Sequence, residues 1–166
     1  MSMTAHGITP CLWFDTQAEE AAKFYASVFK DAKIGKTSRY GKEGVEVHGK
    51  QPGTVMTVAF EIAGQKFLAL NGGPHFKPNE AVSFMISTED QAETDRLWDA
   101  IVGNGGEESM CGWCKDKWGF SWQITPKRLM QLMTDPDPDR ARRASQAMLK
   151  MHRIDIAAIE AAAGGN

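Results

Sequence analysis

The sequence predicts an α+β fold of two βαβββ modules, in which curved, mainly antiparallel mixed sheets surround a pocket and a helical tail follows. The main observation is a weak internal repeat. A polar entry with a threonine and acidic residues precedes an apolar stripe at residues 16–29, and the pattern returns at 88–102. Each segment follows one strand-like run and precedes others. A unit used twice indicates pseudo-twofold symmetry.

The two repeated segments are predicted to be amphipathic helices. Their apolar residues are spaced i, i+1, i+4 and i+5, which places them on one face of a helix. Thr16 and Thr88 are the expected N-caps, and the acidic residues after them suit the positive end of the helix dipole.

Strand-like apolar runs surround both helices. A tight turn is expected at Ala63-Gly64, between two of these runs. The expected strands of the first half are 8–14, 33–40, 54–62 and 65–70, and those of the second half are 81–87, 108–115 and 120–125.

The whole chain is expected to form a single domain. At 166 residues it is long enough for one ordinary core and short for two. Module one is expected at about 6–71, a linker at 72–80, module two at about 81–126, and a helical tail at 127–163 with a break at the prolines of 135–138. The apolar stripe of the tail must be buried, either on its own sheet or on a partner subunit.

Composition excludes some classes of function. A net charge of −2 and a pI of 6.1 provide no general attraction to nucleic acid or anionic lipid. The basic residues near the C-terminus alternate with apolar residues, as on a solvated helix face; they are Arg140, Arg142, Arg143, Lys150 and Arg153. No run approaches the roughly 20 apolar residues of a membrane span, and no signal pattern is visible, so we expect a cytoplasmic protein.

At three places the residues resemble a known family. Residues 8–14, followed by Ala18-Glu19-Glu20-Ala21 and Phe24-Tyr25, are similar to the opening of PhnB-like proteins, and residues 116–124 resemble that family's "DKxGxxWQI" final strand. Residues 148–157 are similar to the family's tail. These proteins belong to the vicinal-oxygen-chelate superfamily of glyoxalases, bleomycin-resistance proteins and extradiol dioxygenases. Their domain also carries the label 3-demethylubiquinone 3-methyltransferase.

The resemblance implies a test for a metal site. Metal-using superfamily members bind a divalent ion with four inward residues, mostly His, Glu or Gln, from the first and last strand of each module. Only Gln123 and Asn71 resemble ligands here, and neutral amides alone bind metal weakly. We therefore predict no metal and no cofactor. The corresponding positions in this chain are Thr9, Ala69 or Asn71, Ala81 or Ser83, and Gln123.

Histidines and cysteines add no second site. His6, His48, His75 and His152 are expected in loops, linker or tail. Cys111 and Cys114 have CxxC spacing, but in a predicted strand their side chains point to opposite faces, unlike a redox pair at a helix N-terminus. Structural thiols are the favoured interpretation, with one cysteine facing the pocket left open.

Strand alternation predicts which side chains face the pocket. The fourth strand is expected to turn Phe67, Ala69 and Asn71 inward, and the eighth strand Ser121 and Gln123, while Trp122 and Ile124 pack under the helices. An aromatic wall with amide and hydroxyl groups suits a small, partly apolar ligand; side chains that simply fill the cup are the alternative. The pocket candidates are Thr9, Cys11, Trp13, Asn71, Ser83, Met85, Trp113 and Gln123.

Two functions remain open. The first is a metal-free small-molecule binding protein, and the second is a glyoxalase- or dioxygenase-type enzyme on an oxygenated or aromatic substrate. The methyltransferase of the family label is less favoured, because neither Gly-rich stretch, 71–73 or 103–106, joins a strand to a helix. No nucleophile–base pair is legible. We expect a homodimer, as is common in the superfamily, that binds a small-molecule ligand and neither nucleic acid nor membrane.

Overall fold

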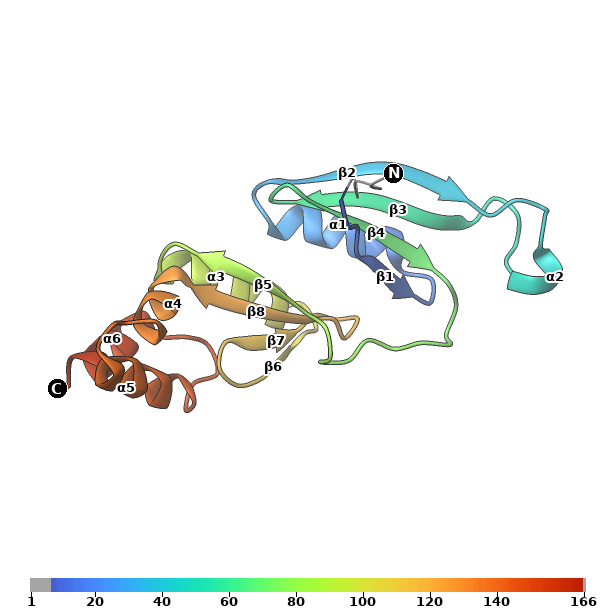
Figure 1. The fold of residues 1–166 in the computed structure, drawn as a ribbon. Helices are drawn as coiled ribbons and strands as arrows, with labels where there is room; N and C mark the ends of the chain where they lie inside the picture. Colours follow the sequence, from blue (N-terminus) through green and yellow to red (C-terminus); the bar gives the residue numbers. More distant parts are fainter. Residues whose placement is uncertain (1–6, 166) are drawn as a thin grey trace, which may run out of the picture. The chain divides into compact units, whose positions relative to one another are not determined.

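The computed structural model describes residues 7–165, so the expectation for His6 lies outside the described residues. The chain divides between Lys77 and Pro78 into two compact units, shown from blue to green and from green to red in Figure 1. This division falls inside the expected linker 72–80. That the two units make one domain stays a prediction.

The first unit contains a four-stranded mixed sheet, sheet A. Its strand order is β1-β4-β3-β2, with β1 parallel to β4 and the other pairs antiparallel. The expected turn at Ala63-Gly64 is confirmed, because both residues have positive φ, at 48° and 81°. The elements are β1 (Cys11–Phe14), α1 (Ala18–Val28), β2 (Ala32–Arg39), α2 (Val45–His48), β3 (Val55–Ile62) and β4 (Gln65–Asn71).

The second unit repeats this topology in sheet B. Its strand order is β5-β8-β7-β6, again with the outer strand β5 parallel to β8. The α+β fold with a duplicated module is therefore confirmed. The elements are β5 (Ser83–Thr88), α3 (Gln91–Val102), β6 (Glu107–Glu108), β7 (Trp113–Lys115) and β8 (Ser121–Pro126).

One strand expectation was wrong. Residues 108–115 do not form a single strand but a short hairpin, in which β6 and β7 pair in antiparallel fashion. Cys111 and Gly112 turn the chain there, with φ of 61° and 82°. A non-glycine residue at positive φ marks a tight turn rather than extended backbone. The structure also has a four-residue helix, α2, where only a loop was expected.

Each sheet packs one face against its helix. In sheet A, Leu12, Phe14 and Phe60 are buried on the side of α1, where Tyr25 stacks on Phe60 at 5.5 Å. In sheet B, Trp122 and Ile124 are buried on the side of α3. We call the opposite sides open face A and open face B.

The helix starts differ from expectation. Asp90, not Thr88, caps α3: its carboxylate accepts a hydrogen bond from Glu93 N at 2.8 Å. Thr88 is instead buried, with its hydroxyl 2.7 Å from that of Thr94. Helix α1 has no side-chain cap from its own N-terminal residues, so Thr16 does not cap it.

The tail is three helices rather than a short helix and one long one. Helices α4 (Lys127–Met133), α5 (Pro138–Met148) and α6 (Ile156–Gly164) surround a small core of their own. The connection between α5 and α6 is tied to the β6–β7 turn, because Cys111 N and Gly112 N donate to Met151 O and His152 O, each at 2.7 Å. The apolar stripe is thus buried on its own chain. The core residues are Leu129, Leu132, Ala144, Ile154, Ile159 and Ala163.

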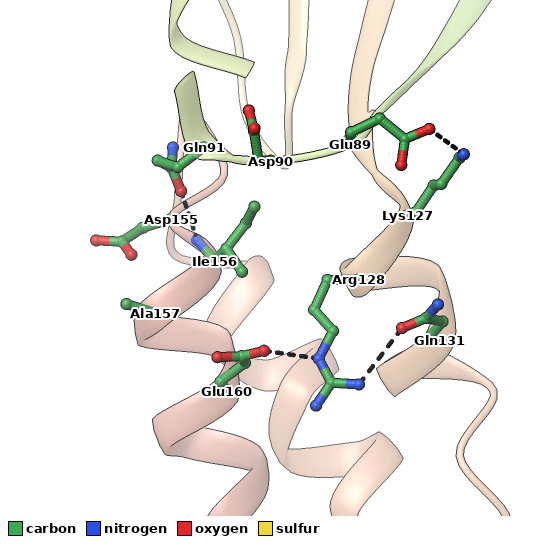
Figure 2. Close-up of a pocket in the computed structure, with 10 residues that line it drawn as sticks. All are labelled: Glu89, Asp90, Gln91, Lys127, Arg128, Gln131, Asp155, Ile156, Ala157 and Glu160. Carbon is green, nitrogen blue, oxygen red and sulfur yellow. Dashed lines mark hydrogen bonds and ion pairs between the residues drawn. The ribbon is translucent and has the colours of Figure 1, made fainter. Parts of the chain in front are cut away.

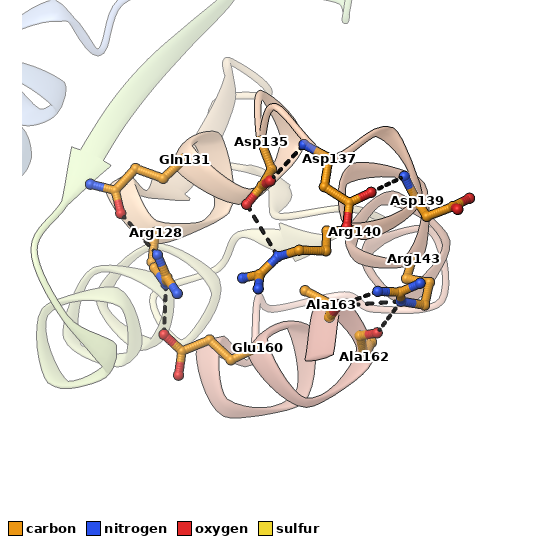
Figure 3. A network of polar contacts seen from close by, with 10 residues as sticks. All are labelled: Arg128, Gln131, Asp135, Asp137, Asp139, Arg140, Arg143, Glu160, Ala162 and Ala163. Carbon is orange, nitrogen blue, oxygen red and sulfur yellow. Dashed lines mark hydrogen bonds and ion pairs between the residues drawn. The ribbon is translucent and has the colours of Figure 1, made fainter. Parts of the chain in front are cut away.

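Polar contacts hold the tail helices together (Figure 3). Arg143 donates to the last carbonyls of α6, reaching Ala163 O at 2.7 Å, so it satisfies a helix C-terminus. Arg140 pairs with Asp135 at 3.2 Å. Within residues 7–165, no helix is long and apolar enough to cross a membrane.

Candidate functional site

Open face B carries two rows of side chains across three strands. Residues in register on neighbouring strands share a face of the sheet. Met85 on β5, Gln123 on β8 and Trp113 on β7 form one row. The second row, which we call the Lys115–Ser121–Ser83 row, is formed by those three residues on β7, β8 and β5. Both rows point away from α3, since Trp122 between them is buried beneath it.

The two rows are joined by one hydrogen bond. Gln123 Nε2 donates to Ser83 Oγ at 2.8 Å, which orients the amide on the open face. Beside it Met85 is 53% exposed, a large value for an apolar side chain in the middle of a strand. Trp113 is half-buried. Open face B therefore offers an apolar surface next to oriented amide and hydroxyl groups, a combination typical of small-molecule sites.

Open face A carries a groove. Cys11 and Trp13 are in register with Leu68 and Leu70 of β4 and so share their face. A cavity of about 410 Å³ lies over this side of the sheet, lined by residues that include Thr9, Ala59 and Leu68. The Lys33–Glu61 ion pair, at 3.4 Å, lies at its margin.

Trp13 is held in a defined position on this face. Its indole Nε1 donates to Gly73 O at 2.8 Å, and its ring meets that of Phe76 edge-on at 4.9 Å. Gly72 makes room for the indole, because a Cβ there would lie 2.2 Å from Trp13 Cζ2. Trp13 is therefore a fixed aromatic side chain on this face, and its role as the wall of a ligand pocket stays a prediction.

Asn71 is not on the open face, which corrects the expected phase of β4. Phe67 and Ala69 are buried toward α1, and Leu68 and Leu70 face outward. Asn71 Oδ1 accepts a hydrogen bond from Ala18 N at 2.8 Å, and its Nδ2 donates to Val55 O at 3.1 Å. The amide thus caps the first turn of α1 from across the fold.

The other candidates fall into two groups. Cys11 and Trp13 share open face A, and Thr9 lies just before β1 in the lining of its groove. Ser83, Met85, Trp113 and Gln123 share open face B. That they line one pocket stays a prediction. Sequence reasoning named Ser121 as inward-facing but overlooked Lys115, whose signal was its position opposite Ser121 in a β-hairpin.

The donor set does not fit the superfamily's divalent metal. The amide oxygen of Asn71 accepts a hydrogen bond from the start of α1, so it is not available to a metal. The other positions expected to hold ligands offer only the hydroxyls of Thr9 and Ser83 and the amide of Gln123, which donates to Ser83. Such neutral oxygens bind divalent ions weakly without carboxylate or imidazole. Across residues 7–165, no three His, Cys, Asp or Glu side chains are grouped as metal ligands would be.

The cysteines differ in environment. Cys114 is buried on the helix side of β7, where burial and then the negative charge of Asp116 raise the pKa of its thiol to about 12. Cys111 lies in the β6–β7 turn, and the two are not bonded. Cys11 is exposed, although partial burial of its sulfur raises the pKa of its thiol. Cys11 and Cys114, whose thiol pKa values are raised, are therefore not low-pKa redox thiols of the thioredoxin type.

A polar cleft of about 560 Å³ lies between the start of α3 and the tail helices (Figure 2). Its charges are mostly paired within the cleft: Lys127 with Glu89, and Arg128 with Glu160 at 2.7 Å. Gln91 Oε1 accepts a hydrogen bond from Ile156 N at 2.8 Å and so anchors α6. The polar groups of the cleft therefore connect the tail helices to the module, and we do not assign the cleft as a ligand site.

Comparisons with known proteins agree with this architecture. The family model described as 3-demethylubiquinone-9 3-methyltransferase matches residues 6–125, which leaves the three tail helices outside the match. The structure of a PhnB protein from Bacillus cereus is similar at 31% identity, covering 73% of this chain and 99% of that one, with a TM-score of 0.63. Protein PA1353 from Pseudomonas aeruginosa shares the fold at 18% identity, 74% and 98% coverage and a TM-score of 0.58. The search of curated proteins found no match.

Proposed function

Because the chain belongs to the 3-demethylubiquinone-9 3-methyltransferase family, the PhnB-like branch of the vicinal-oxygen-chelate superfamily, we propose that it is a binding protein for a small organic molecule, with a metal-free site on open face B. The observation that carries the proposal is the Gln123–Ser83 hydrogen bond beside half-exposed Met85. Apolar surface gives a ligand binding energy, and oriented polar groups give it a fixed pose.

The methyltransferase activity in the family description is less well supported by this chain's residues. Binding of S-adenosylmethionine commonly uses a Gly-rich loop that joins a strand to a helix. Gly72 and Gly73 follow β4 but lead into the segment toward β5, and residues 103–106 follow a helix, α3. Neither place provides the helix N-terminus that such a loop presents to its ligand.

The first test combines metal content with stability. Protein purified without an affinity tag is assayed for bound metal, and thermal melts are recorded with and without EDTA. We expect metal far below one ion per chain and unchanged melts. About one zinc, nickel, iron or manganese ion per chain, with a melt lowered by EDTA, would replace this proposal by the enzyme hypothesis.

The second test locates the ligand. A library of small aromatic and oxygenated compounds is screened by thermal shift, and each compound that raises the melting temperature is recovered and analysed by mass spectrometry. We expect hits recovered unchanged, with affinity reduced in Gln123→Leu and retained in the surface control Asn104→Leu. Hits converted to products would identify an enzyme, and hits insensitive to Gln123→Leu would place binding elsewhere.

A further inference from the structure

Ser121 is a buried polar group without a partner. The residue is 2% exposed, and its hydroxyl oxygen has no hydrogen bond. Such groups are rare in folded proteins, because burial removes water without replacing it. The neighbouring buried polar groups Thr88, Thr94 and Asp116 all have partners. The hydroxyl of Ser121 differs from these three groups in having no hydrogen-bond partner, and this calls for an explanation.

Its surroundings are built to receive negative charge. Ser121 lies between Ser83 and Lys115 in the Lys115–Ser121–Ser83 row. The side chain of Lys115 is only partly exposed, and its ammonium is paired with the carboxylate of Glu80, which precedes β5. This pairing raises the pKa of Lys115, so the lysine stays charged. The strand register thus gives Lys115, Ser121 and Ser83 adjacent positions on open face B.

We propose that the Lys115–Ser121–Ser83 row binds the anionic group, a carboxylate or a phosphate, of an organic ligand whose apolar body lies on Met85 and Trp113. The inference rests on the proposed function and narrows it to organic anions. Anionic oxygens accept strong hydrogen bonds from hydroxyl and ammonium donors. Ser121 Oγ–H would gain the partner that it lacks.

Glu80 then has a defined part. Its carboxylate forms an ion pair with the ammonium of Lys115. In the complex, the anionic group of a ligand would form this ion pair instead. Glu80 is more exposed than Lys115, with side-chain exposures of 60% and 31%. An exposed ion pair contributes little to stability, so an anion can displace the carboxylate at small cost. Glu80 therefore competes with the ligand for the same cation.

The test uses three probes of similar shape: phenylacetate, phenyl phosphate and the neutral phenylacetamide. Each is titrated into ¹⁵N-labelled full-length protein, and amide shifts are followed by NMR. We expect one or both anions to shift the amides of Ser83, Lys115 and Ser121 and to bind more tightly than phenylacetamide. The stronger of the two anions identifies carboxylate or phosphate as the preferred group.

Variants separate binding from folding. Ser121→Ala and Lys115→Gln should each weaken anion binding on the order of tenfold, the scale of one lost charge-assisted hydrogen bond. Glu80→Gln should tighten it several-fold by releasing Lys115. Lys23→Gln removes the same charge from an exposed pair on α1 and should have no effect. Ser121→Ala should melt no lower than the wild type, because it removes only an unpaired hydroxyl.

Two results would overturn the inference. One is anion affinity unchanged in both Ser121→Ala and Lys115→Gln; the other is a clear loss of stability in Ser121→Ala, which would make the hydroxyl structural. If phenylacetamide still shifts Met85, Trp113 and Gln123 in those cases, the proposed function stands and only the anion row fails. If no probe shifts any amide of open face B, both fail.

Discussion

Replacement of Asn71 by alanine tests whether this amide is structural or part of the binding site. The change removes the acceptor of Ala18 N and the donor to Val55 O, at 2.8 and 3.1 Å. A buried backbone group left without its partner costs about 1–3 kcal/mol. Asn71 is only 7% exposed, so little water can replace it. We expect a loss of about 2–4 kcal/mol in the free energy of unfolding.

The assay is urea denaturation followed by circular dichroism, with a thermal melt that we expect to fall by roughly 5–15 °C at about 2–4 °C per kcal/mol. Asn104→Ala is the matched control, because Asn104 donates one exposed hydrogen bond, to Ala100 O. It should change stability by less than about 0.5 kcal/mol. Probe binding at open face B should be unaffected in both variants. An Asn71→Ala protein as stable as the control, with weakened probe binding, would refute the structural assignment.

The remaining predictions concern packing, pH and assembly. Gly72→Ala places a methyl group against the indole of Trp13, so we expect a loss of about 1–3 kcal/mol and altered near-ultraviolet circular dichroism; an unchanged spectrum would contradict this. Burial raises the pKa of Cys114 from 9.0 to about 12, so its stabilising effect is complete below pH 9 and is lost as pH rises toward 12. The wild type should therefore lose about 1 kcal/mol per pH unit in that range, and a slope equally steep in Cys114→Ala would assign the loss to other groups. We also expect a homodimer, which a monomer mass by light scattering at micromolar concentration would exclude.

The repeat was legible in the sequence, but the phase of β4 was not. Residues 67–70 read Phe-Leu-Ala-Leu, apolar at every position, so alternation alone cannot say which face is buried. The parallel register with β1, which aligns Trp13 with Leu70, decides it. On β5 and β8 polar residues break the run, and alternation assigns Ser83 and Gln123 to one face, where a hydrogen bond joins them.

The tail shows a different limit of sequence reasoning. Its apolar stripe predicted burial but not the break at residues 149–155 between α5 and α6. Residues in this break pair with a segment distant in sequence, because Met151 O and His152 O accept hydrogen bonds from the backbone N–H groups of the β6–β7 turn. A local signal for the restart was present in Asp155, whose carboxylate accepts a hydrogen bond from Ala158 N at 3.0 Å and caps α6. Long-range backbone pairing of this kind leaves no periodic trace in sequence.

Asn71 and Ser121 show why burial alone does not identify a functional residue. Both are polar, both are more than nine-tenths buried, and both were expected to face inward. Asn71 has its amide oxygen and nitrogen paired within its own unit, so folding accounts for it fully. The hydroxyl of Ser121 has no hydrogen-bond partner and lies in register with a lysine. The fold therefore explains where Ser121 lies but not why a buried hydroxyl is present there. Asn71→Ala should therefore destabilise the protein without weakening anion binding. Ser121→Ala should weaken anion binding without destabilising the protein.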